Sequence, residues 1–358
     1  MRIILDCDDV LFQCNQSAVD QLNKQKGTHY SLESVDAWGK LGNELDERLE
    51  FFKDPDFIRS LPVYPGAKEF VQELSERAEV FFATGVEVSC AGARVESMIK
   101  QFLEINPGNI LIGTRKDILS ADFLLDDGFH NICNAQVKYP VLFRRPWNRI
   151  VSGRLTVSSY KEFLALIDLT HKKPSRRDSG SVSMLFDHSK TGKVVALVGP
   201  SGCGKTTIAD QLVKSGNFEL VRSYTTRPKR NDKDQYHFLT KDAFLKKKEN
   251  AFFFETSCYN DQYYGTSMED LHEIIMRGKK ALLILDINGA IAMKRTFGDQ
   301  CTNVFVKREK AYCIQSVLKR RLSIEETTRR LLAMEAELKN EELCDMTIYN
   351  MEEAFYGL

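Results

Sequence analysis

The spacing that predicts chemistry most clearly in this chain is that of two glycines, Gly199 and Gly204, with Lys205 and Thr206 directly after the second. They lie in VVALVGPSGCGKTT (194–207), which fits the phosphate-binding pattern G-x-x-x-x-G-K-T. Backbone N–H groups of such a loop surround an anion at a helix N-terminus. The lysine reaches the β- and γ-phosphates, and the threonine holds Mg²⁺. A glycine-rich turn with an incidental lysine is the alternative, but an apolar strand pattern precedes the loop and a helix pattern follows it. We expect ATP to bind Gly199, Ser201, Gly202, Cys203, Gly204, Lys205, Thr206 and Thr207.

Acidic residues in the first half could also do phosphate chemistry. Two apolar runs end in carboxylates, namely Asp6, Asp8 and Asp9 after IIL, and Asp126 and Asp127 after FLL. The carboxyl ends of parallel strands share one sheet edge, so these groups can meet there around one Mg²⁺. Thr84 ends the run VFFAT, and Lys116 lies in GTRKD; a hydroxyl and a cation suit a phosphoryl group. Each residue alone could be a helix cap or a turn residue, and only their combination indicates a site.

A basic, hydroxyl-rich segment follows the phosphate-binding loop and could hold the acceptor of the phosphate. Within FELVRSYTTRPKR (218–230), Arg227 and Arg230 suit a bidentate clamp on a second phosphate. A solvated basic turn is the alternative, and it loses weight because further polar and aromatic candidates follow. These candidates are Tyr236, Glu255, Tyr264, Thr266 and Asp286.

The elements that must position these residues alternate between short apolar runs and helical patterns in both halves. Buried runs separated by helices predict parallel sheets with helices on both faces, so both halves are α/β. The polar segment between them has the composition of a linker. We predict one domain over 1–168, a linker over 169–191 and a second domain over 192–358. The basic run within the linker could contact a phosphate backbone, but a solvated hinge fits it better.

Composition narrows the functional classes. Lysine plus arginine equals aspartate plus glutamate at 50 each, which argues against nucleic acid or an anionic membrane as partner. Nine scattered cysteines without CxxC pairs fit a reducing compartment rather than a disulfide framework or a zinc site. The N-terminal apolar run is too short for a signal peptide, and no stretch is long enough to span a membrane. We expect a cytoplasmic protein and leave a homodimer open.

Residues 1–165 resemble the haloacid dehalogenase-like phosphatases, and PVYPGAKEFVQEL (62–74) and LFRRPWNR (142–149) resemble the 5′(3′)-deoxyribonucleotidase family within them. The resemblance implies a Rossmann-like domain in which Asp6 is the nucleophile and Asp8 the general acid and base. It implies that Thr84 and Lys116 bind the phosphoryl group. The Mg²⁺ ligands would then be Asp6, the Asp8 carbonyl, Asp126 and Asp127.

The segment from about 12 to 62 would be a small helical cap over the substrate. Its aromatic residues could stack on a nucleobase or simply pack the cap against the core. We keep both alternatives open for Tyr30, Trp38, Phe51 and Phe52.

Residues 192–356 resemble guanylate kinase, a P-loop nucleoside monophosphate kinase, through the ordered segments S-x-T-T-R, Y-H-F, Y-Y-G-T and L-D-I. The resemblance implies a site for GMP formed by Ser223, Arg227, Arg230, Tyr236, Glu255, Tyr264, Thr266 and Asp286. Ser223, Glu255 and Thr266 would read the guanine, whose N1–H and N2–H₂ suit one carboxylate. Residues 319–338 would be a lid that brings Arg320 or Arg321, with Arg330, to the triphosphate. Asn288 departs from the family's Asp-Ile-Asp and puts the acceptor nucleotide in question.

We therefore interpret the chain as a bifunctional nucleotide enzyme that uses Mg²⁺ in both domains. Its second domain would phosphorylate GMP or dGMP with ATP, and its first would dephosphorylate (deoxy)nucleoside monophosphates. Three alternatives stay open: a polynucleotide-end kinase and phosphatase, a kinase for another or modified nucleoside monophosphate, and a catalytically inactive scaffold. Intact Lys205, Thr206, Arg227 and Arg230 argue against the scaffold.

Overall fold

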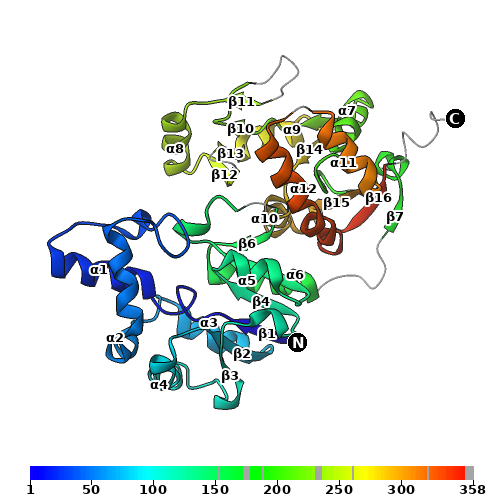
Figure 1. The fold of residues 1–358 in the computed structure, drawn as a ribbon. Helices are drawn as coiled ribbons and strands as arrows, with labels where there is room; N and C mark the ends of the chain where they lie inside the picture. The colour runs from blue at the N-terminus through cyan, green and yellow to red at the C-terminus, as the bar shows by residue number, and fades with distance from the viewer. Residues whose placement is uncertain are drawn as a thin grey trace. The chain divides into compact units, whose positions relative to one another are not determined.

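A computed structural model describes residues 1–151, 153–171, 178–187, 189–229, 236–259, 262–320 and 322–350 (Figure 1). The chain divides into two compact units, one of Met1–Val151 with Leu155–Leu164 and the other of Ser152–Arg154 with Ala165–Leu358. Each unit is an α/β structure built around a parallel sheet, as the sequence predicts. Among the described helices, none combines the length and the apolar character needed to cross a membrane.

The first unit has a six-stranded sheet in the order β3-β2-β1-β4-β5-β6, and every neighbouring pair is parallel. The strands are β1 Arg2–Leu5, β2 Glu79–Thr84, β3 Ile110–Ile112, β4 Phe123–Asp126, β5 Tyr139–Phe143 and β6 Leu155–Val157. The connecting helices include α3 Ala67–Ser75, α4 Ala91–Gln101 and α5 Phe129–Asn134, and α6 Tyr160–His171 follows the last strand. The chain runs from β1 out to β3 at one edge of the sheet and then returns to β4 on the other side of β1. This reversal of the strand order places the ends of β1 and β4 side by side.

The predicted cap is helical. It contains α1 Cys14–Lys26, the 3₁₀ segments η1 Leu32–Ser34 and η2 Glu44–Lys53, and α2 Pro55–Ser60. Its apolar side chains form a cluster around the buried Val19, Leu22 and Leu45. Tyr30 and Phe51 pack against this cluster, which favours the packing alternative for these two aromatic residues. Trp38 differs, because 53% of its surface is exposed.

The second unit has a six-stranded parallel sheet in the order β7-β16-β15-β8-β14-β9. Its strands are β7 Asp178–Ser181, β8 Val194–Val198, β9 Phe218–Leu220, β14 Lys280–Ile284, β15 Cys301–Lys307 and β16 Met346–Tyr349. Its helices are α7 Lys205–Lys214, α8 Lys241–Glu249, α9 Met268–Met276, α10 Ile287–Phe297, α11 Lys310–Leu318 and α12 Ile324–Lys339. A smaller four-stranded sheet combines β10 Tyr224–Thr225, β11 His237–Phe238, β12 Phe253–Tyr259 and β13 Gln262–Ser267.

Part of the predicted linker is structured. Residues 178–181 form β7, which pairs with β16, and the 3₁₀ segment η7 Val182–Phe186 follows it. Leu185 is fully buried in the core of the second unit. The polar composition of this segment fits an edge strand as well as a linker, because an edge strand with exposed side chains needs few apolar residues. The domain boundaries that we set from the sequence stay a prediction.

Candidate active sites

The acidic residues of the first unit meet because β1 and β4 are parallel neighbours in register. Leu5 pairs with Leu125, so Asp6 follows one strand where Asp126 ends the next. The Asp6 backbone N–H donates to the Leu125 carbonyl oxygen at 2.9 Å, which continues the ladder beyond β1. The sheet edge therefore brings together the carboxylates that the sequence placed at strand ends.

Lys116 lies between two of these carboxylates. Its Nζ atom is 2.6 Å from Asp6 Oδ1 and 2.6 Å from Asp126 Oδ2, and all three side chains are buried. Burial raises the pKa of Asp6 to about 7, against the opposing charge of Lys116. The pKa of Lys116 is raised because the charges of Asp6 and Asp126 outweigh its burial. A nucleophilic carboxylate next to a buried cation suits attack on a phosphoryl group.

Three carboxylates at this edge fit a divalent cation. Asp6, Asp126 and Asp127 each offer an oxygen atom within 4.8 Å of the others. Asp127 Oδ2 accepts a hydrogen bond from Trp147 Nε1 at 2.8 Å, but its buried Oδ1 has no hydrogen-bond partner among the described residues. Burial and the charges of Asp6 and Asp126 raise the pKa of Asp127 well above its usual range. An unpartnered buried carboxylate oxygen beside two others is a donor set that Mg²⁺ would satisfy.

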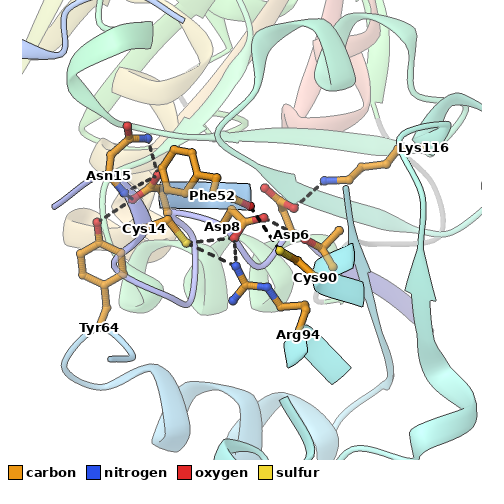
Figure 2. Close-up of polar contacts among 11 residues, drawn as sticks. Asp6, Asp8, Cys14, Asn15, Phe52, Tyr64, Cys90, Arg94 and Lys116 are labelled. Carbon is orange, nitrogen blue, oxygen red and sulfur yellow. Dashed lines mark hydrogen bonds and ion pairs between the residues drawn. The ribbon is translucent and has the colours of Figure 1, made fainter. Parts of the chain in front are cut away.

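Asp8 is held by a different set of groups (Figure 2). Its Oδ2 accepts a hydrogen bond from Thr84 Oγ1 at 2.9 Å. Its Oδ1 accepts from Cys14 Sγ at 2.9 Å and forms an ion pair with Arg94. The structure thus brings Thr84 to Asp8, and it adds Cys14 and Arg94, which the sequence analysis missed.

Asp9 stabilises the turn that directly follows Asp6 and Asp8. Its φ angle of 55° lies in the left-handed region, and its carboxylate accepts from the backbone N–H of Asn15 at 3.0 Å and from Asn15 Nδ2 at 2.6 Å. Arg145 Nε donates to the Asp9 carbonyl oxygen at 2.6 Å. The third carboxylate of the N-terminal cluster is therefore satisfied within the fold.

The phosphate-binding loop of the second unit joins a fully buried strand, β8, to the start of α7 at Lys205. Gly202 has a φ angle of 87°, and a Cβ atom there would lie 2.4 Å from the Cys313 carbonyl oxygen. Lys205 Nζ donates to the carbonyl oxygens of Gly199 at 2.6 Å and Pro200 at 3.0 Å. Thr206 and Thr207 are exposed on the first turn of α7, whereas Cys203 is fully buried.

Helix α12, which belongs to the predicted lid, forms two hydrogen bonds with Ser201 of this loop. Arg330 Nη1 donates to Ser201 Oγ at 2.9 Å, and Glu337 Oε2 accepts from the Ser201 backbone N–H at 3.1 Å. Arg330 also pairs with Glu326 at 2.8 Å. Arg320 is exposed in the turn after α11, while Arg321 lies outside the described residues.

Three predicted phosphate ligands of the acceptor site lie close together. The Arg227 guanidinium carbon is 4.9 Å from the centroid of the Tyr236 ring, and the Tyr236 and Tyr264 rings are 6.1 Å apart. Ser223 precedes β10, and Arg230 lies outside the described residues.

Two of the predicted guanine ligands, Glu255 and Thr266, form a second group. Thr266 Oγ1 donates to Glu255 Oε1 at 2.9 Å. Burial and, secondly, the charge of Asp286 raise the pKa of Glu255 to about 7. Asp286 also caps α10 by accepting from the Gly289 backbone N–H at 2.8 Å. The roles of all these residues in binding and catalysis stay predictions.

Comparisons with known proteins match the two halves of the chain to two different families. Residues 1–173 match the family described as 5′ nucleotidase, deoxy (pyrimidine), cytosolic type C protein, and residues 191–355 match the guanylate kinase family. The guanylate kinase of Chlorobaculum tepidum is 35% identical over 150 residues, which are 41% of this chain and 70% of that protein. The guanylate kinase of Sulfurimonas denitrificans is 31% identical over 166 residues, or 45% of this chain and 79% of that protein.

Other matches cover different shares of the proteins compared. The guanylate kinase of Helicobacter hepaticus is 36% identical over 119 residues, 32% of this chain and 60% of that protein. The crystal structure of guanylate kinase from Anaplasma phagocytophilum has a TM-score of 0.36 at 22% identity and covers 45% of this chain and 78% of its own. The crystal structure of a haloacid dehalogenase-like hydrolase from Burkholderia xenovorans LB400 has a TM-score of 0.32 at 16% identity. This match covers 46% of this chain and 94% of that chain.

Proposed function

This chain belongs to the guanylate kinase family through residues 191–355 and carries a 5′-nucleotidase-type phosphatase domain before it, and from that premise we propose its substrates. The kinase transfers the γ-phosphoryl group of ATP to GMP or dGMP. The phosphatase hydrolyses (deoxy)nucleoside monophosphates. Both reactions use Mg²⁺.

The observation that carries the phosphatase proposal is the bridge from Lys116 to Asp6 and Asp126. An oxygen of Asp6 attacks phosphorus, the bond to the leaving oxygen breaks, and that oxygen takes a proton from Asp8. Water then attacks the aspartyl-phosphate and returns a proton to Asp8, which releases inorganic phosphate and restores Asp6. Lys116 and Thr84 hold the phosphoryl oxygens in both steps.

Mg²⁺ would be held in the first unit by Asp6, Asp126 and Asp127 with the Asp8 carbonyl oxygen, and in the second by Thr206. Bound there, it supplies charge neutralisation for the phosphate oxygens. The unpartnered Asp127 Oδ1 supports this assignment in the first unit.

The kinase proposal is supported by a loop that suits phosphates and a carboxylate that suits guanine. Glycines with left-handed φ angles let the backbone of 199–204 approach an anion, and Lys205 lies at the helix start. Glu255, oriented by Thr266, can accept both N–H donors of guanine. Arg227 with Arg230 clamps the acceptor phosphate, and Arg330, with Arg320 or Arg321, neutralises charge on the transferred group.

The experiment that tests the proposal compares the full-length protein with Asp6→Asn and Lys205→Ala by chromatographic assay over all common nucleoside monophosphates, with and without ATP. We expect Asp6→Asn to lower phosphatase turnover by at least about a thousandfold and leave kinase turnover unchanged, because Asp6 is the nucleophile of the phosphatase site alone. Lys205→Ala should do the reverse. Survival of phosphatase activity in Asp6→Asn, or of kinase activity in Lys205→Ala, would refute the corresponding assignment.

A further inference from the structure

Arg94 is a fully buried charge next to the acid–base residue of the phosphatase. It lies on α4, and none of its side chain is exposed. Its Nη2 atom forms an ion pair with Asp8 Oδ1 and is 3.6 Å from Cys14 Sγ. Its guanidinium carbon lies 4.8 Å from the centroid of the Phe12 ring, which covers one face of the group. Figure 2 shows Arg94 and Cys14 converging on Asp8 from two sides.

The hydrogen bonds of Arg94 differ from those of a structural arginine. Arg48, in the same unit, is equally buried, and each of its nitrogens has a partner: Asn15 Oδ1 at 3.0 Å, the Leu45 carbonyl oxygen at 3.1 Å and the Gly39 carbonyl oxygen at 2.7 Å. The Nε and Nη1 atoms of Arg94 have no partner among the described residues. Burying an arginine with two unsatisfied nitrogens is costly, and such exceptions in a native fold call for a functional reason.

The contacts on Asp8 divide its two oxygens. Oδ1 is occupied by the Arg94 guanidinium and the Cys14 thiol, whereas Oδ2 accepts only from the Thr84 hydroxyl among the hydrogen bonds of the described residues. The Thr84 hydroxyl can rotate toward a phosphate, but the buried guanidinium is confined by the ring of Phe12 and the helix that carries it. Oδ2 is therefore the oxygen that can become free when a phosphate arrives.

We propose that Arg94 is a positioning residue that fixes Asp8 so that Oδ2 alone exchanges the proton with the leaving group and then with water. This inference rests on the proposed phosphatase function. In the first step the proton passes from Oδ2 to the leaving oxygen as the phosphorus–oxygen bond breaks, and in the second it returns to Oδ2 from the attacking water. Arg94 touches neither substrate nor reacting atoms and acts only through the carboxylate.

The choice of leaving group tests this role. An alkoxide leaving from a nucleoside monophosphate or glycerol phosphate needs the proton, whereas p-nitrophenolate leaves from p-nitrophenyl phosphate without it. In full-length Arg94→Met we expect kcat/KM, which reports the first step alone, to fall by about a hundredfold or more for the alkyl phosphates and by less than about fivefold for p-nitrophenyl phosphate. Hydrolysis of the aspartyl-phosphate is common to both substrates, so a loss in that step lowers kcat for both alike. Arg94→Lys, which keeps a positive charge, should recover part of kcat/KM for the alkyl phosphates.

Two further variants separate positioning from folding. Asp8→Asn should show the same selectivity for the aryl substrate, and adding Arg94→Met to it should cost nothing more, because residues acting as one unit are not additive. Arg48→Met, the buried structural control, should lower kcat/KM for both substrates by one common factor. If Arg94→Met folds too poorly to assay, Cys14→Ala removes the other contact on Oδ1 and should show the same selectivity at smaller amplitude.

Three outcomes would overturn the inference. The first is an equal loss of activity on both substrates in Arg94→Met, and the second is the same result in Cys14→Ala where that variant is assayed instead. The third is a double variant, Asp8→Asn with Arg94→Met, in which the losses of the two single variants add. Phosphatase activity that survives Asp6→Asn would instead refute the proposed function, so the two failures are distinguishable.

Discussion

Glu255 is the residue of the second unit whose ionisation matters most for its proposed ligand. Burial is the larger cause of its raised pKa of about 7 and the charge of Asp286 the smaller, against the hydrogen bond from Thr266. Only the ionised carboxylate can accept both guanine donors. A group with this pKa is half protonated at neutral pH, where most carboxylates are fully charged.

We predict that the KM for GMP rises by about tenfold between pH 8 and pH 6, since the ionised fraction of Glu255 falls by that factor. Steady-state kinetics across this range measure it. Glu255→Gln has no titrating group at this position, so its KM for GMP should be higher at every pH. The KM of this variant should vary only with the ionisation of GMP itself, and its pH profile is therefore the control. A parallel pH dependence in the wild-type protein and Glu255→Gln would contradict the role.

The same pKa has a consequence for stability. The folded-state pKa lies above the ordinary value of 4.5, so the folded protein binds this proton more tightly than the unfolded chain does. The contribution of Glu255 to the free energy of unfolding is therefore lost as the pH rises from about 4.5 through about 7. A carboxylate that suits guanine is kept at the expense of stability near neutral pH.

At the scale of single residues, the sequence indicated which side chains lie at the ends of strands, but not which buried side chains contact them. Asp6, Thr84 and Asp126 could be predicted because each follows an apolar run whose end must lie at the sheet edge. Arg94 could not be predicted, since an arginine within a helical pattern is normally exposed. Only the tertiary packing of α4 brings it to Asp8.

The junction of β8 and α7 depends on close approach between elements. Gly202 lies against α11, where the Cys313 carbonyl oxygen leaves no room for a side chain. That oxygen belongs to a helix backbone and cannot rotate away as a side chain could. The loop shape therefore requires glycine here for two reasons, the left-handed φ angle and the contact.

We predict that Gly202→Ala weakens ATP binding by about ten- to a hundredfold, equivalent to backbone strain of 1–3 kcal/mol. Isothermal titration calorimetry measures this affinity. Gly216→Ala is the matched control, because Gly216 has a similar φ angle of 84° but nothing within 4 Å of an added Cβ. Phosphatase activity reports the integrity of the first unit in both variants. Equal ATP affinity in the two variants would show that the contact with α11 does not matter.

At the scale of elements, local patterns predicted the central strands and the loop, but not β7. The central strands have three to five apolar residues, and the loop has glycines at fixed spacing, so the information is local. Strand β7 has the sequence DSGS and is recognised only through its pairing with β16. Its formation depends on a partner more than a hundred residues away in the sequence.

For the whole molecule, one chain carries a site that adds phosphate to nucleotides and another that removes it. If both sites acted on one monophosphate, the protein would consume ATP without net product. We therefore infer that the two units prefer different nucleotides.

We predict that full-length protein given ATP and GMP in excess forms ADP and GDP in equal amounts and releases almost no inorganic phosphate. A coupled phosphate assay measures the release, and Asp6→Asn provides its background. Steady phosphate release from GMP that disappears in Asp6→Asn would show that the sites share a substrate.

Strand β7 also bears on how separate molecules meet. It is the outermost strand of its sheet, and it covers the edge of β16, where Met346 and Ile348 are buried. An uncovered β16 would offer free N–H and C=O groups beside apolar side chains, a template on which another chain can pair. The exposed serines of β7 make a poorer template. A kinase fragment that begins at residue 192 would lack β7, so the edge of β16 would be left open to pairing with another chain.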